Sequence, residues 1–183
     1  MRVIATELDD VLCIEPRVFG DQRGYFFESW SRRLYEEVGI VGDLVQDNVS
    51  FSSRGVLRGL HLQNPHAQGK LVQVARGSVF DVAVDVRMGS KNFGKWVGYE
   101  LSEENHRQLY IPPGFAHGFC VLSEVALFTY KCTDYYCRES EIGVHYADPE
   151  IGIAWPIDDP LVSEKDAKHP RLSEIPRERL PKL

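Results

Sequence analysis

From residue 71 onward, apolar and polar residues alternate along the chain with a period of two, which is typical of β-strands. The clearest stretch is 80–86, where Phe80 and three valines would share one face, while Asp81, Ala83 and Asp85 would share the other. Further strands are predicted at 71–74, 95–101, 107–111, 116–122 and 126–132, separated by polar or Pro/Gly-rich turns. Short strands without helices between them predict an all-β sandwich or barrel.

The N-terminal forty residues carry weaker signals. Residues 2–18 are expected to be extended, with Pro16 ending a strand, and a turn at 20–24 would lead into an aromatic strand at 25–27. Ser29 or Ser31 is placed to cap a short helix that Gly39 would stop. We expect no other helix before the C-terminal tail.

The tail from residue 149 holds six of the ten prolines, so we expect an irregular segment that wraps the sandwich, with one helical turn near Ser163. No repeat, low-complexity tract or linker divides the chain. The sequence therefore predicts a single domain over residues 1–183.

Composition excludes several classes of protein. The net charge of −6 argues against a general nucleic-acid binder. No apolar run approaches the ~20 residues that span a bilayer, and acidic residues near the N-terminus replace the apolar core of a signal peptide. The four cysteines lack CxxC spacing and are expected to be reduced packing residues. These features indicate a cytoplasmic protein without a membrane or nucleic-acid partner.

One segment departs from the acidic character of the chain. The 33 residues from Asn48 to Phe80 contain no Asp or Glu, although even spreading would place roughly five there. The same segment holds Arg58, His61 and Lys70. Either this is a chance gap in charge, or the protein holds a local site for a small anion.

His61 is a candidate base within this segment. On a strand, Leu60 and Leu62 would point to one side and His61 to the other, together with Gln63. A neutral imidazole beside a bound anion is a suitable proton acceptor at neutral pH. A lone histidine is more often structural, so both interpretations stay open on this observation.

A second motif, PPGFAHGF at 112–119, resembles the second motif of the cupin superfamily. The first cupin motif would supply histidines at positions 61 and 63, but this chain has Gln63. Because two histidines alone make a poor divalent site, we predict no metal, and we expect His117 to be a hydrogen-bonding residue of the cavity.

Several motifs occur in an order that identifies a family resemblance. They are FGDQRG at 19–24, RGLHLQ at 58–63, QGK at 68–70, PPGFAHGF at 112–119, YKCTDYY at 130–136, DP at 148–149, WP at 155–156 and SEKD at 163–166. Together they resemble the dTDP-4-dehydrorhamnose 3,5-epimerases. The resemblance implies a cupin-type jelly-roll sandwich, no cofactor, and inversion of C3 and C5 of a dTDP-4-keto-6-deoxy sugar.

The resemblance also implies residue roles. His61 would be the base, Asp166 its partner, Lys70 the main cation near the enolate oxygen and Tyr130 the acid. The remaining matches would bind the nucleotide sugar: Arg23, Glu28, Gln46, Asp47, Asn48, Arg58, His117, Tyr136, Glu141 and Lys165. Without the resemblance, Tyr130 would be taken for a core tyrosine and Arg23 for a turn arginine in a surface ion pair.

The family is also expected to form homodimers, with residues 2–14 pairing across subunits and Arg23 and Glu28 completing the neighbour's site. Leu62 replaces an aromatic residue usual in the family, and His145 or Tyr146 falls where tryptophan is common. Two alternatives stay open: an epimerase that inverts one carbon or acts on another sugar nucleotide, and a cupin that binds such a ligand without catalysis.

Overall fold

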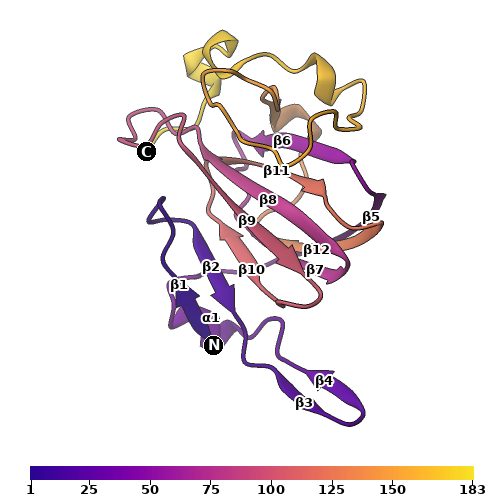
Figure 1. Ribbon diagram of the computed structural model, residues 1–183. Helices are drawn as coiled ribbons and strands as arrows, with labels where there is room; N and C mark the ends of the chain where they lie inside the picture. Colours follow the sequence, from indigo (N-terminus) through magenta and orange to yellow (C-terminus); the bar gives the residue numbers. More distant parts are fainter.

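The computed structural model describes residues 1–183 and consists mainly of two antiparallel sheets that face each other (Figure 1). In spatial order, the six-stranded sheet contains β1 (Arg2–Ile4), β2 (Leu12–Glu15), β10 (Gln108–Ile111), β7 (Lys70–Arg76), β12 (Val125–Cys132) and β5 (Gln46–Ser53). The five-stranded sheet contains β13 (Glu141–Gly143), β6 (Leu57–Gln63), β11 (Phe115–Val121), β8 (Ser78–Asp85) and β9 (Trp96–Ser102). The prediction of a β-sandwich is confirmed.

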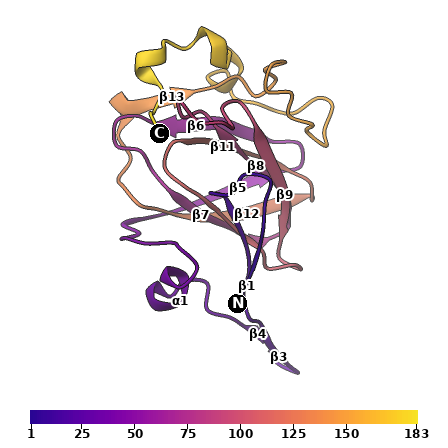
Figure 2. The ribbon, with the colours of Figure 1, turned by 90° about the vertical axis from the view of Figure 1, so that its left-hand side faces the viewer.

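The smaller elements lie at the two ends of the sandwich. A hairpin of β3 (Phe19–Asp21) and β4 (Gly24–Phe26) projects away from the sheets, next to the single α-helix α1 (Arg32–Glu36) (Figures 1 and 2). Four short 3₁₀ turns follow β12: η1 (Arg138–Ser140), η2 (Asp166–Lys168), η3 (Leu172–Glu174) and η4 (Arg177–Arg179). None of the helices has the length and apolar character needed to cross a membrane.

The N-terminal and tail predictions are largely confirmed. β2 ends just before Pro16, and α1 has Ser31 at its N-cap, although the serine side chain donates no capping bond and accepts none. Gly39 follows the helix with a φ of 93°, a left-handed conformation that glycine adopts without strain. The turn expected near Ser163 is η2, where the Asp166 N–H donates to Ser163 Oγ at 3.0 Å.

Three hydrophobic clusters form the core. A 16-residue cluster lies between the sheets and includes Val72, Leu109 and Phe128 from one sheet and Phe119 and Leu101 from the other. A second cluster lies on the outer face of the five-stranded sheet, beneath the tail, and a third packs α1 against the outer face of the six-stranded sheet. The tail is therefore a covering layer, as Figure 1 shows above β6 and β11.

β8 is buried on both of its faces. Val82 and Val84 pack under the tail, whereas Asp81 and Asp85 on the opposite face are fully buried. The alternation was predicted from the sequence, but the burial of both carboxylates was not. Each carboxylate has a partner that compensates for its burial.

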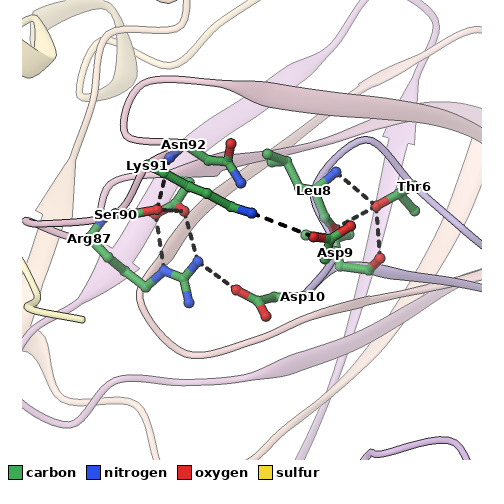
Figure 3. A network of polar contacts seen from close by, with 10 residues as sticks. Thr6, Leu8, Asp9, Asp10, Arg87, Ser90, Lys91 and Asn92 are labelled. Atoms are coloured by element: carbon green, nitrogen blue, oxygen red, sulfur yellow. Dashed lines mark hydrogen bonds and ion pairs between the residues drawn. The ribbon is translucent and has the colours of Figure 1, made fainter.

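Arg87 compensates for Asp85. It also attaches the N-terminal loop to the sandwich through Asp10 (Figure 3). Its guanidinium donates to Asp85 at 3.0 and 2.7 Å and to Asp10 at 2.7 Å, and Ser90 Oγ donates to Asp85 at 2.7 Å. Burial alone would raise the pKa of Asp85, but these hydrogen bonds outweigh it and hold the pKa below its usual value.

The strand pattern did not reveal β5, which the sequence analysis left unassigned. Its apolar side chains Val49 and Phe51 are 68% and 61% exposed, while the polar residues between them face inward. This reverses the usual arrangement of an antiparallel strand, in which the apolar side faces the core.

Candidate active site

A cavity of about 370 Å³ lies at one end of the sandwich, between the two sheets. Its walls come from β5, β7 and β12 of one sheet and from β6 and β13 of the other. The lining residues are Gln46, Asn48, His61, Leu62, Gln63, Gln68, Lys70, Tyr130, Tyr136 and Glu141. Seven of them are sequence candidates, and His61, Lys70 and Tyr130 are among those assigned to the chemistry.

His61 reaches this cavity because its neighbours on β6 are anchored on the other side. Leu60 and Leu62 pack in the cluster beneath the tail, so the imidazole between them points inward and is about one-third exposed. β6 also lies unusually close to β11: a Cβ at Gly59 would meet Gly118 Cα at 2.6 Å, and Gly59 has a φ of 126°. Only glycine fits this crossing, which fixes the start of the strand that carries His61.

Asp166 holds His61 in place. Its Oδ1 lies 2.8 Å from His61 Nε2, and its Oδ2 accepts the Gly59 N–H at 3.2 Å. Burial opposes ionisation of this carboxyl, but the hydrogen bond and charge of His61 outweigh it, and the pKa of Asp166 is about 2. Asp166 is therefore an anion at neutral pH, able to orient the imidazole and to stabilise an imidazolium.

The opposite wall carries the other two chemical groups. Lys70 begins β7, and burial lowers the pKa of its ammonium. Tyr130 lies on β12, half-buried against Phe128, with burial raising the pKa of its phenol more strongly than the charge of Arg58 lowers it.

Gln63 and His117 occupy the positions of cupin metal ligands but have other partners. The Gln63 amide donates to the carbonyls of His66 and Tyr135 and accepts the Cys137 N–H, so it fastens the 133–137 loop to β6. His117 is buried next to Asp81, with Nε2 2.9 Å from the nearer carboxylate oxygen.

The His117–Asp81 pair lies on β11 and β8, and His117 is directly opposite His61 in the β6–β11 register, so the two imidazoles are on the same face of the sheet. Burial lowers the pKa of His117, opposed by the Asp81 charge, and burial raises the pKa of Asp81, opposed by His117. His117 does not line the cavity, where it was expected, but is buried beside it on the strand next to that of His61.

The rim of the cavity is polar. The Tyr136 hydroxyl donates to Glu141 Oε2 at 3.1 Å, and Lys165 Nζ donates to the same oxygen at 2.6 Å. Gln46 Oε1 accepts the Tyr136 N–H, which places this exposed ring beside the opening. The rim joins β5, β13 and the tail.

Arg58 lies on the cavity side of β6 without lining the cavity, where its Nε donates to Ser52 Oγ at 3.1 Å. Three other predicted binding residues are elsewhere in the chain. Asp47 is on the opposite face of β5, paired with Lys131 at 2.8 Å. Arg23 is at the tip of the projecting hairpin, paired with Asp21, and Glu28 is exposed beyond it.

Comparison with known proteins decides the family. The family model described as dTDP-4-dehydrorhamnose 3,5-epimerase matches residues 5–174. The chain belongs to this epimerase family. It is 57% identical to the dTDP-4-dehydrorhamnose 3,5-epimerase of Shigella flexneri over 168 residues, covering 91% of this chain and 93% of the relative.

A solved structure from the same family has the same fold. It is the dTDP-6-deoxy-D-glucose-3,5-epimerase of Legionella pneumophila in complex with dTDP-4-keto-L-rhamnose, with 54% identity, a TM-score of 0.97, and coverage of 100% of this chain and 98% of that one. The all-β sandwich is thus the cupin fold of these isomerases. A dTDP-4-dehydrorhamnose 3-epimerase of Streptomyces niveus is similar at 40% identity, over 91% of this chain and 81% of the relative.

Two residues beside the site were missed by sequence reasoning. Asp81 was assigned to the polar face of its strand, but nothing in the alternation pairs it with His117. His169 follows Asp166 by three residues, and its Nε2 lies 3.3 Å from Asp166 Oδ1. The i, i+3 spacing on a helical turn was the available signal, because it places both side chains on one side of η2.

Proposed function

We propose that this epimerase inverts C3 and C5 of dTDP-4-dehydro-6-deoxy-D-glucose and releases dTDP-4-dehydro-L-rhamnose. Both carbons are adjacent to the C4 carbonyl, so loss of either proton gives an enolate whose charge is on O4. Such a reaction needs a base on one face of the sugar, a cation near O4 and an acid on the opposite face. Since every step is a proton transfer, the mechanism includes no cofactor.

The observation that supports this proposal best is the position of His61 and Tyr130 on opposite sheets, lining one cavity. A sugar ring between them has the imidazole on one face and the phenol on the other. His61 removes the proton, and Asp166 stabilises the imidazolium that forms. Tyr130 returns a proton on the other face, and inversion follows from this geometry.

Lys70 stabilises the enolate. It lines the same cavity and is partly buried, so water screens its charge less than it would at the protein surface. Arg58 adds a second cation near Tyr130. The raised pKa of Tyr130 keeps the phenol protonated at neutral pH, so the acid is available in every resting enzyme molecule.

The nucleotide occupies the polar rim. Tyr136 offers an exposed ring face for stacking on thymine, while Gln46, Asn48, Glu141 and Lys165 supply hydrogen bonds and charge around it. His117, held by Asp81, supports the site from the strand next to that of His61.

The chain acts as a homodimer in this proposal. β1 is an open edge of the six-stranded sheet, and apolar side chains are exposed on β5 and on the hairpin: Phe19, Tyr25, Phe26, Val49 and Phe51. Exposed apolar residues grouped in this way favour burial against a second copy. The hairpin then carries Arg23 and Glu28 toward the neighbour's cavity, where Arg23 binds the diphosphate with its planar fork.

Turnover in heavy water tests the proposal. The protein is incubated with dTDP-4-dehydro-6-deoxyglucose, and NMR locates the deuterium and the configuration of each carbon. We expect deuterium and inversion at both C3 and C5. Label and inversion at C3 alone would instead assign the chain to the one-carbon epimerases, to which the Streptomyces niveus relative belongs. Absence of label at both carbons would contradict epimerisation.

A further inference from the structure

Three metal-ligating side chains converge beside the cavity: His61, Asp166 and His169, whose donor atoms all lie within 4.8 Å of one another. Asp166 Oδ1 is the shared centre, 2.8 Å from His61 Nε2 and 3.3 Å from His169 Nε2. Donors bonded at about 2.0 Å to a tetrahedral ion are about 3.3 Å apart. These separations are close to that value.

His169 has a nitrogen without a hydrogen-bond partner. Its ring is 12% exposed, and Nε2 is buried and makes no hydrogen bond, because Asp166 Oδ1 is near it but outside hydrogen-bonding geometry. The ring is fixed by its neighbours: a Cβ at Gly143 would lie 2.1 Å from His169 Cε1, so glycine is required to accommodate the imidazole. Gly143 is also directly opposite His61 in the β6–β13 register, which brings the two imidazoles together edge to face at 5.6 Å.

We propose that His61, Asp166 and His169 form a binding site for a divalent transition-metal ion of the zinc type, and that an ion bound there inhibits the epimerase. Two imidazoles and a carboxylate, with a fourth position open to the cavity, are a ligand set that Zn²⁺ and Co²⁺ accept in four-coordinate geometry. This site differs from the usual cupin metal site, whose positions 63 and 117 are occupied by hydrogen-bonded Gln63 and His117.

The ligands are prepared for a cation. Asp166 is fixed by the Gly59 N–H, which donates to its Oδ2 at 3.2 Å, and the His169 ring packs edge to face against His61, so the donor atoms are in place before an ion binds. The nearest lysine, Lys165, is paired with Glu141 at 2.6 Å, which moderates its repulsion of an incoming ion. Binding uses the lone pair of His61, so the base can no longer accept the substrate's proton. The inhibition rests on the proposed role of His61, whereas the binding does not.

The binding test uses Co²⁺ as a spectroscopic probe. Metal-free wild-type protein is titrated with Co²⁺, and Zn²⁺ is then added in competition. We expect the intense visible absorption of four-coordinate Co²⁺, removed by Zn²⁺. His169→Gln keeps the size and polarity of the side chain but lacks the second imidazole, and it should bind at least ~10-fold more weakly. His145→Asn, which changes an imidazole outside the site, should bind as the wild type does.

The activity test adds Zn²⁺ during turnover. Zinc should stop the wild type and the His145→Asn variant, a chelator should restore both, and His169→Gln should be active and resistant at the same concentrations. Equal Co²⁺ affinity in wild type and His169→Gln, or a weak six-coordinate spectrum, would overturn the site. A wild type that binds Co²⁺ but inverts neither carbon would leave the site standing and refute the proposed function.

Discussion

At the scale of single residues, His61 and His117 are each held by a buried carboxylate, but the two pairs are differently exposed. His61 is open to the cavity and paired with an ionised Asp166, whereas His117 and Asp81 are both buried. Only the first pair can exchange protons with a ligand without disturbing the core. This difference favours His61 over His117 as the base of the proposed reaction.

Replacing Tyr130 by phenylalanine separates the two halves of the reaction. The ring keeps its packing against Phe128, so stability should barely change, while the acid is lost. His61 should still form the enolate and reprotonate it from its own face. We expect deuterium at C5 with little inversion there, measured by NMR in heavy water. His61→Asn is the matched control and should lose both exchange and inversion, by roughly 10²–10⁴-fold. Wild-type inversion in Tyr130→Phe would return Tyr130 to the role of a core residue.

Asp166→Asn should change the dependence of stability on pH. The folded-state pKa of about 2 is below the usual 3.8, so the ionised carboxylate stabilises the folded protein above pH 4 and loses this effect as the pH falls toward 2. The variant should therefore be less stable than the wild type at neutral pH, and the difference in their free energies of unfolding should narrow between pH 4 and 2. Urea unfolding at several pH values measures it. A gap that stays constant would show that the loss has a packing origin.

Some of these residues could be placed from the sequence pattern, and others could not. The parity of β6 and β12 was enough to place His61 opposite its leucines and Tyr130 beside Phe128. Asp166 is 105 residues from His61, and no local pattern joins positions so far apart, so only the family resemblance connected them. His169 and the Asp81–His117 pair depend on how the tail and β11 pack, which the resemblance did not specify.

At the scale of elements, β8 is buried on both faces. Its two buried carboxylates, Asp81 and Asp85, therefore need partners inside the protein. Asp85 ends this strand in a fully buried position and depends on Arg87, which also lies over the Phe115 ring at 4.4 Å. The same arginine binds the N-terminal loop through Asp10 (Figure 3). One side chain therefore connects the strand, the following loop and the chain's beginning.

Arg87→Met should destabilise the fold by about 3–5 kcal/mol, because it leaves the Asp85 carboxylate buried without its cation. Lys91→Met is the matched control: it removes a neighbouring ion pair with Asp9 that is exposed and 3.9 Å long, and it should change stability by no more than about 0.5 kcal/mol. Denaturant unfolding compares the two. Similar losses in both variants would contradict the dependence of Asp85 on Arg87.

β5 explains why one element of the fold was not predictable. Alternation identifies a strand when its apolar side faces the core, but β5 turns Val49 and Phe51 outward and polar groups toward the cavity. The inward polar residues serve the site, and the outward apolar ones are explained only by a surface that covers them. A single sequence contains neither the cavity nor the covering surface.

At the scale of the whole molecule, the proposed dimer makes each site depend on two chains. Light scattering at micromolar concentration should give twice the mass of the chain, and a purely monomeric protein would refute the assembly. The projecting hairpin (Figure 2) suggests a more specific test, because Arg23 is in its turn and does not line the cavity of its own chain.

Mixing two impaired variants tests whether Arg23 acts across the interface. Arg23→Glu and His61→Asn should each be poorly active alone. In a mixed dimer, one cavity combines an intact His61 with an intact Arg23 from the other chain. After unfolding and refolding together, an equal mixture should regain roughly a quarter of wild-type activity, because half of the dimers are mixed and half of their sites are intact. Recovery no greater than the sum of the separate variants would place Arg23 in its own chain's site, or in none.

The tail that covers the five-stranded sheet is made after the strands of that sheet, so the nascent chain passes through a stage in which the sheet is uncovered. His61 leaves the ribosome 105 residues before Asp166, a delay of roughly 5–20 s at ordinary elongation rates. Until the tail is made, the apolar outer face of β6 and β8, including Leu62 and Val84, has no cover, because Ile151, Leu172 and Leu180 come later in the chain than both strands. The nascent chain thus exposes an apolar sheet face while His61 still lacks its carboxylate partner, Asp166. The same tail segment ends both conditions: when it docks, Asp166 pairs with His61, and Ile151, Leu172 and Leu180 cover the apolar face of the sheet.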